Sequence, residues 1–343
     1  MKAAILVNIK KPLVVSELEM PKTLEFGQVL VKIHYSGFCG SQLSEIDGSW
    51  GEDKNIPHLL GHEGSGIVLD TGPGVRTVSK DDHVVCHYME SSGLESPTPK
   101  YKWGDKIVSA GGVTTFNNRA IISENRLTKI HKDFDLRMAP LFGCAIPTAW
   151  GIINNEAQIK IGQSLVIFGL GGVGLAMCQC ASLVSAYPII GVDLHENKIN
   201  LAKKFGISHG FINKFETIDE EIRKIVGSSG ADTVIDVTGN VKVIEQCYKL
   251  TNPVGKTILC GIPNEGHNVS IFTKPLHLGK TLKGSRGGSS KPDIDIPRYI
   301  KILSAKKINL NNLITHEYSL ENINDAVSTL RKGQAGRIII KMD

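Results

Sequence analysis

The residues best suited to chemistry in this chain are two cysteines and a histidine that stand upstream of a glycine-rich turn. Cys39, His62 and Cys144 offer the thiolates and the imidazole that zinc prefers in proteins. They lie so far apart that only a fold can bring them together, and sequence statistics alone favour each cysteine as a small buried side chain over a ligand. The segment Gly169–Gly174 has the G-x-G-x-x-G spacing of a dinucleotide-binding turn. Zinc and a nicotinamide cofactor together would supply hydride transfer.

The glycine-rich segment has the surroundings that a dinucleotide-binding turn requires. It follows the aliphatic run Ser164–Phe168 and opens a helix-like stretch of small residues. In such a turn Gly169 permits the tight backbone, Gly171 lets the backbone approach a pyrophosphate, and Gly174 allows close packing of helix on sheet. The residues predicted to form the cofactor turn are Gly169, Gly171, Gly172, Val173 and Gly174.

An acidic residue ends the next aliphatic run after the turn. Asp193 stands where a carboxylate would bind the ribose hydroxyls of the cofactor and repel a 2′-phosphate, which favours NAD over NADP. Lys198 follows it by five residues, where it would either reach the same ribose or remain a solvated helix lysine.

The elements that must position these residues fall into two parts. Up to about residue 146 the chain is turn-rich, with short strand-like runs such as Val29–His34 and Gly66–Leu69. From about residue 160 strand-like and helix-like runs alternate, which predicts a doubly wound parallel sheet with helices on both faces. The predicted elements there are strands Ser164–Phe168, Pro188–Asp193, Asp232–Val237 and Thr257–Gly261, and helices ending near Ser185 or spanning Ile218–Ile225 and Val243–Leu250. After about residue 287 an amphipathic stretch, Ile296–Ala305, and a strand, Arg337–Ile340, are expected to return to the first part.

Composition narrows the class of protein. The chain has 343 residues, enough for two domains, and 39 Lys+Arg against 34 Asp+Glu give a net charge of only +5. The basic residues are scattered, so nucleic acid is not implied. Seven cysteines without a disulfide-like framework indicate reduced thiols. No apolar run is long enough for a signal peptide or a spanning helix, so we expect a cytoplasmic protein that binds neither membrane nor nucleic acid.

Three phrases around the candidate ligands carry a family resemblance. Gly37-Phe38-Cys39-Gly40-Ser41, Gly61-His62-Glu63-Gly64 and Gly143-Cys144-Ala145, in this order ahead of the glycine turn, resemble the zinc-dependent medium-chain alcohol dehydrogenases over essentially the whole chain. The resemblance implies a mainly-β GroES-like catalytic domain at residues 1–146 and 288–343 and a Rossmann domain at 147–287. It also implies a small alcohol or aldehyde as substrate and a homodimer or homotetramer.

The same resemblance assigns roles to individual residues. Cys39, His62 and Cys144 become the ligands of one catalytic zinc, with the fourth position open for water or substrate. Glu63 stands where relatives keep an acid near the metal, either behind the ligands or in exchange with water as a ligand. Ser41 would hydrogen-bond the substrate oxygen and relay its proton.

Three further residues match family positions at the cofactor. Thr148 matches a residue near the nicotinamide, Val173 one packed behind its ring, and Arg337 a basic residue on the pyrophosphate. For Thr148 and Val173, plain core packing explains the residue equally well.

The chain departs from the family pattern at three places. Many relatives hold a second, structural zinc with four cysteines in a lobe corresponding to residues 86–104, where this chain has only Cys86, so we predict one zinc per chain. Gln42 stands where relatives often carry an aspartate that accepts the other N–H of the histidine ligand. Ser44 stands where some relatives place the histidine that ends a proton relay, which leaves Glu45, Ser44 or water as the exit.

Other functions remain open from the sequence. The leading prediction is hydride transfer between an alcohol and NAD. A polyol or sugar-derivative dehydrogenase is the first alternative, which Cys144 disfavours because such relatives often bind zinc with an acid instead. The second is a non-catalytic NAD-binding scaffold, which the intact ligand triad disfavours.

Overall fold

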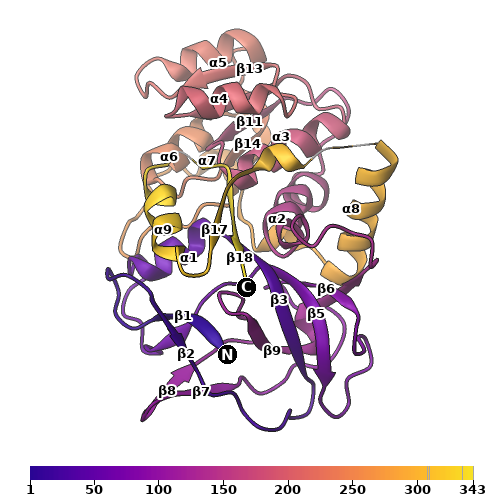
Figure 1. Ribbon diagram of the computed structural model, residues 1–343. Helices are drawn as coiled ribbons and strands as arrows, with labels where there is room; N and C mark the ends of the chain where they lie inside the picture. Colours follow the sequence, from indigo (N-terminus) through magenta and orange to yellow (C-terminus); the bar gives the residue numbers. More distant parts are fainter. Residues whose placement is uncertain (307, 309, 334, 343) are drawn as a thin grey trace. The chain divides into compact units, whose positions relative to one another are not determined.

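The computed structural model describes residues 1–306, 308, 310–333 and 335–342, and it divides the chain into two compact units. The first unit comprises Met1–Pro147 and Lys291–Asp343, and the second comprises Thr148–Ser290. Among the described helices none is both long and apolar enough to cross a membrane. Figure 1 follows the chain through both units from indigo to yellow.

The first unit is built on two sheets. One has the strand order β2-β1-β4-β8-β7, and the larger has the order β10-β6-β5-β3-β18-β17 with β9 also paired to β3. The strands are β1 Lys2–Leu6, β2 Val14–Glu17, β3 Gln28–Phe38, β4 His58–Leu59, β5 Gly64–Thr71, β6 His83–Cys86, β7 Lys100–Trp103, β8 Lys106–Ser109, β9 Arg119–Ser123, β10 Leu127–Ile130, β17 Ile314–Ser319 and β18 Arg337–Lys341. The helical segments are α1 Gly40–Ile46, η1 Glu124–Arg126, η2 Ala139–Phe142, α2 Ala145–Gly151, α8 Pro292–Lys306, η5 Asn311–Leu313 and α9 Ile323–Arg331, with α2 ending beyond the unit boundary.

Alternating apolar residues explain the larger sheet. On β3, Val29, Val31 and Ile33 are at most 1% exposed and pack with Ile338 and Ile340 of β18 in one core. The two strands pair antiparallel, with Ile338 opposite Phe38, and Figure 1 shows the yellow β18 beside the indigo β3. The predicted return of the C-terminal strand to the first half of the chain is therefore confirmed.

The second unit contains one six-stranded parallel sheet. Its order, β13-β12-β11-β14-β15-β16, is that of dinucleotide-binding Rossmann sheets, in which successive strands are added on one side of the first strand and then, from the fourth strand on, on its other side. Its elements are η3 Ile152–Ala157, β11 Leu165–Phe168, α3 Gly172–Leu183, β12 Ile189–Asp193, α4 Glu196–Lys203, β13 His209–Ile212, α5 Ile218–Val226, β14 Ala231–Asp236, α6 Val241–Leu250, β15 Thr251–Leu259, α7 Lys274–His277, β16 Thr281–Gly284 and η4 Gly287–Ser289.

Helices cover both faces of this sheet, as the alternating pattern predicted. Val166 and Phe168 of β11 belong to one core with Ile222 of α5 and Cys247 of α6, whereas Ile167 points to the opposite face beside Gly174 of α3. Strands β13 and β16 and helix α4 were not predicted. The two strands lie at the sheet edges, and all three elements have short apolar runs in which the alternation of apolar and polar residues is weak.

Candidate metal centre and cofactor turn

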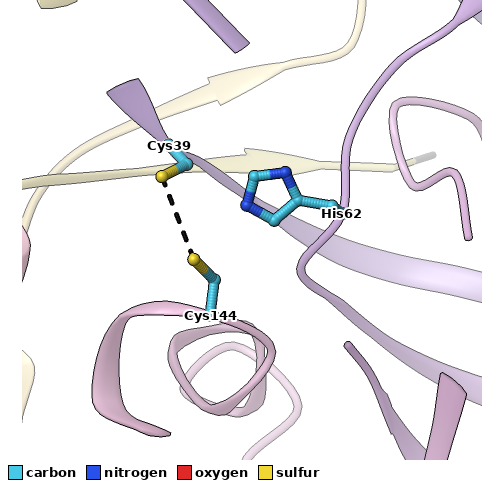
Figure 2. Close-up of side chains that lie close together, drawn as sticks. All are labelled: Cys39, His62 and Cys144. Atoms are coloured by element: carbon cyan, nitrogen blue, oxygen red, sulfur yellow. Dashed lines mark hydrogen bonds between the residues drawn. The ribbon is translucent and has the colours of Figure 1, made fainter. Parts of the chain in front are cut away.

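Three segments of the first unit bring the candidate ligands together. Cys39 follows β3 as the N-cap of α1, His62 lies between β4 and β5, and Cys144 precedes α2. Their ligand atoms all lie within 4.8 Å of one another, and the two sulfurs are 3.9 Å apart (Figure 2). Among the described residues this is the one such group of three or more His, Cys, Asp or Glu side chains.

This geometry fits zinc. Two thiolates at about 2.3 Å from a tetrahedral zinc are separated by about 3.8 Å, close to the observed sulfur separation. Nε2 of His62 is buried and makes no hydrogen bond within the described part of the chain, and Figure 2 shows a ring nitrogen of His62 facing the sulfurs. A buried nitrogen without a partner is costly unless something binds it, and a metal ion would.

The two thiols interact with each other through a hydrogen bond. A hydrogen bond from the Cys144 thiol lowers the pKa of Cys39 well below its ordinary value, and the same interaction raises that of Cys144. Burial depresses the pKa of His62, but the Cys39 thiolate, Glu63 and Glu45 together raise it above its usual value. The surroundings therefore favour the thiolate at Cys39, the form that ligates zinc, whereas Cys144 keeps its proton and donates it in the hydrogen bond to Cys39.

Gln42 connects the start of α1 to the histidine ligand. Its Oε1 accepts the backbone N–H of Cys39 at 3.3 Å, and its amide group also contacts Nδ1 of His62. Because Nδ1 faces Gln42, Nε2 is the ring nitrogen left for a metal. When Nε2 ligates, Nδ1 carries the proton and the Gln42 amide must present its oxygen. Ser41 lies on the first turn of α1, and its Oγ is buried without a hydrogen bond in the described part of the chain.

Glu63 and Arg337 form a buried ion pair beside this centre. Glu63 is fully buried and Arg337 is 3% exposed, and Oε1 of Glu63 accepts from the guanidinium. Burial raises the pKa of Glu63 to about 7, against the opposing effect of Arg337. Glu63 is therefore paired with Arg337 and is not one of the three clustered ligands. Arg337 belongs to the first unit, where its partner is Glu63.

The glycine turn follows β11, at the point where the strand order of the second sheet switches from one side of β11 to the other. Gly169 follows β11 with φ +98°, and a side chain there would strike Thr238 after β14. Nothing lies within 4 Å of a Cβ placed on Gly171, which leaves the backbone open to a ligand. A Cβ on Gly174 would lie 2.0 Å from the carbonyl oxygen of Gly169 and 3.7 Å from a methyl carbon of Ile167, so this glycine allows α3 to approach the end of β11 closely.

The first turn of α3 provides an anion site beside that open backbone. Gly172 is buried and Val173 half-buried, and the N-cap Gly171 supplies no side-chain acceptor for the first amides of the helix. A pyrophosphate would satisfy those amides and interact favourably with the helix dipole, so the turn fits NAD.

Asp193 ends β12 next to this turn. Its Oδ2 accepts the backbone N–H of Leu170 at 2.7 Å, and its Oδ1 accepts that of His195 at 3.0 Å. Lys198 lies 4.0 Å from the same carboxylate. Thr148 is 7% exposed at the start of the second unit and carries at least one polar interaction.

Comparisons with known proteins agree with this arrangement. The model of the alcohol dehydrogenase GroES-like domain matches residues 25–132, and that of the zinc-binding dehydrogenase matches residues 172–305. A class-3 alcohol dehydrogenase from Cereibacter sphaeroides is 32% identical, with 99% of each chain covered. An S-(hydroxymethyl)glutathione dehydrogenase from Paracoccus denitrificans is also 32% identical over 99% of each chain.

The chain belongs to the zinc-dependent alcohol dehydrogenase family.

A solved structure shows that the likeness of this alcohol dehydrogenase to known proteins includes the fold. Benzyl alcohol dehydrogenase from Acinetobacter calcoaceticus superposes with a TM-score of 0.89 at 26% identity, covering 100% of this chain and 99% of that one. The predicted family, fold class, zinc and NAD are therefore confirmed, and the chain is an oxidoreductase of the NAD-dependent alcohol dehydrogenase class.

In this dehydrogenase a buried carboxylate organises the loop that follows β6. Glu124 is 1% exposed and accepts the backbone N–H groups of Arg76, Thr77 and Leu94 at 2.6–2.8 Å, together with the Thr77 hydroxyl at 2.9 Å. These hydrogen bonds hold the pKa of Glu124 below its usual range although burial opposes them. Cys86 is buried on β6, and burial raises its pKa, so it remains a neutral thiol.

Sequence reasoning missed two further carboxylates. Glu124 ties loops that are far apart in sequence, and nothing in its neighbourhood signals this. Asp236 is fully buried at the end of β14 and accepts from Thr238 and Gly239, which shapes the turn that touches Gly169. An acid followed by Thr and Gly after an aliphatic strand was a visible signal of such a turn.

Proposed function

We propose that this chain oxidises an alcohol to its aldehyde or ketone with NAD, or catalyses the reverse reaction, using one zinc ion at Cys39, His62 and Cys144. The observation that carries the proposal is the geometry of those ligand atoms: sulfurs 3.9 Å apart beside a buried, unpartnered His62 nitrogen. Three protein ligands leave one position of a tetrahedral ion open, where zinc would act as a Lewis acid that favours loss of the alcohol proton.

The protein groups around that position have separate tasks. Ser41, with its unpartnered hydroxyl, is suited to bind the substrate oxygen and to pass on its proton. Arg337 holds Glu63 next to the centre, where the carboxylate balances charge. We assign the nicotinamide contacts to Thr148 and Val173, and an approach to the pyrophosphate to Arg337, by resemblance to the family.

The cofactor turn would bind NAD in preference to NADP. NAD supplies the hydride acceptor, and its pyrophosphate would lie on the open backbone at Gly171. Asp193 lies where its carboxylate would accept from the adenosine ribose hydroxyls and repel a 2′-phosphate. Lys198, 4.0 Å from that carboxylate, is a second group for the same ribose.

We further propose a cytoplasmic homo-oligomer, a dimer or tetramer. The second unit exposes large apolar side chains on β15 and on the connection from β15 to the edge strand β16. They are Val254 at 72%, Ile262 at 64%, Phe272 at 71% and Leu278 at 66% exposed. Such a cluster next to an unpaired sheet edge favours association between identical chains.

A steady-state panel tests the reaction. Zinc-loaded chain is mixed with NAD or NADP and with simple alcohols, benzyl alcohol, polyols and S-(hydroxymethyl)glutathione, and NADH or NADPH formation is followed by absorbance. We expect oxidation of an alcohol with NAD and its loss in Cys39→Ser. Preference for polyols would favour the sugar-alcohol alternative, and no turnover with any substrate would favour the non-catalytic scaffold.

A further inference from the structure

An acid, a histidine and a second acid lie next to the metal centre and have no task in the chemistry above. They are Glu45 on α1, His58 on β4 and Asp53 on the connection between them, all in the first unit. Ser41 and Glu45 are four residues apart on α1, so their side chains are neighbours on one face of the helix. The hydroxyl of Ser41 is buried and makes no hydrogen bond within the described chain, so the i,i+4 placement puts it within reach of the Glu45 carboxylate through one bridging water.

Ser44, which lies between Ser41 and Glu45 in the sequence, is a poor alternative to Glu45 as the proton acceptor. Ser44 Oγ donates to the carbonyl oxygen of Gly40 within its own helix, at 3.4 Å, and a hydroxyl has no basic form near neutral pH. Of the three exits that the sequence left open, Glu45 is the side chain with a basic form and a position next to Ser41.

The surroundings of Glu45 suit a proton acceptor. Its side chain is half-buried, and burial raises its pKa above the usual value for glutamate. His62 and His58 oppose that rise, whereas Asp53 and Cys39 add to it. A carboxylate whose pKa moves toward neutrality takes up and releases a proton more readily near physiological pH.

His58 is held rigidly beside this acid. Its Nε2 lies 2.7 Å from Oδ2 of Asp53, and its Nδ1 lies 2.9 Å from the carbonyl oxygen of Leu59. Burial raises the pKa of Asp53, but the Asn55 N–H and His58 outweigh it, so Asp53 stays ionised. With both ring nitrogens engaged, His58 is a fixed neighbour of Glu45 rather than a mobile surface side chain.

We propose that Glu45 receives the proton that leaves through Ser41 during alcohol oxidation, and that His58, fixed by Asp53, is a positioning residue for Glu45. The proposal rests on the proposed function. Oxidation breaks one C–H and one O–H bond of the alcohol, and the hydride with its two electrons goes to NAD. The remaining proton passes to Ser41 Oγ as that hydroxyl gives its own proton to the Glu45 carboxylate, which then releases it to water. Reduction of the carbonyl compound runs the same transfers in reverse.

The first test compares Glu45→Gln with wild type on the best alcohol of the panel. The amide keeps the shape of the side chain but cannot accept the proton, so we expect kcat for oxidation to fall about tenfold or more while KM and the Kd for NAD are unchanged. The kcat–pH profile should move to higher pH, and added buffer base should restore rate only in the variant. Glu45→Asp should retain most of the rate, and the matched control Glu52→Gln, at an exposed position in the same region, should match wild type.

The second test needs no turnover. In zinc-loaded chain without NAD, ¹³C NMR of labelled glutamate side chains follows Glu45, assigned by the signal lost in Glu45→Gln. Because His58 favours the ionised carboxylate, His58→Gln should raise the pKa of Glu45. An unchanged Glu45 titration would overturn the role of His58.

The outcomes separate this proposal from the proposed function. Active wild type together with an unchanged kcat–pH profile and no buffer dependence in Glu45→Gln overturns the relay alone. Wild type that oxidises no alcohol overturns the relay and the proposed function together.

Discussion

Replacing Glu124 by glutamine should destabilise the first unit strongly, although no ligand or reacting group is touched. Oε1 of Glu124 accepts three hydrogen bonds and Oε2 accepts the N–H of Leu94. A glutamine oxygen in the Oε1 position keeps three bonds but removes their charge, and its NH₂ group then faces the Leu94 N–H. The variant therefore weakens three bonds and leaves one buried donor unpaired.

The magnitude follows from those four bonds. Loss of charge assistance costs about 0.5–1 kcal/mol per retained bond, and an unpaired buried N–H costs about 1–3 kcal/mol, which gives about 2.5–6 kcal/mol in total. For a unit of this size each kcal/mol lowers Tm by about 2–4 °C, so Tm should fall by about 5–24 °C.

Calorimetry across pH provides the assay. The pKa of Glu124 is depressed in the folded chain, so its contribution is fully present above the ordinary glutamate pKa of 4.5 and is lost as pH falls through the lower folded value. The difference in Tm between wild type and Glu124→Gln should therefore shrink on acidification. Glu19→Gln, at an exposed position, is the control. A variant within about 2 °C of wild type at neutral pH would refute the reasoning.

Three further outcomes follow from the site. Metal analysis should give one zinc per chain in wild type and much less in Cys144→Ser, and two per chain would contradict the single-centre prediction. Gly171→Ala should raise the Kd for NAD without lowering Tm, because a Cβ at this position meets no other atom of the protein. Gly174→Ala should lower Tm, because its Cβ would meet the Gly169 carbonyl. Equal effects of the two variants on Tm would count against this distinction. Arg337→Met leaves the Glu63 carboxylate buried and unpaired and should cost about 3–5 kcal/mol in unfolding free energy by denaturant titration, with partial recovery when Glu63→Gln is added.

The parts of the molecule that the sequence predicted are those with a local signal. The turn Gly169–Gly174 is recognisable because an aliphatic strand precedes it and an acid follows the next strand. Cys39, His62 and Cys144 are far apart in the chain, so their meeting followed from family resemblance and not from spacing. The roles given to Glu63, Ser41, Thr148, Val173, Lys198 and Arg337 stay predictions.

What the sequence could not predict depends on contacts across the chain. The pairing of Glu63 with Arg337 joins positions on different strands, and neither residue type indicates the other. Glu124 likewise acts through backbone N–H groups of loops around Arg76 and Leu94, and backbone donors leave no mark in an amino-acid sequence. Carboxylates that serve backbone amides in this way become visible only once the loops are placed.

The position of β18 has a consequence for biosynthesis. This strand lies between β3 and β17 and carries Arg337 to Glu63, yet about three hundred residues separate it from β3 in the order of translation. While the ribosome makes the second unit, β9 already pairs with the first half of β3, but Tyr35–Phe38 have no partner on the β18 side and Glu63 has no Arg337. The parallel sheet of the second unit can form first, and the metal pocket reaches its final electrostatic state only after β18 emerges. The buried ion pair beside the three ligands is thus among the last contacts of the first unit to form.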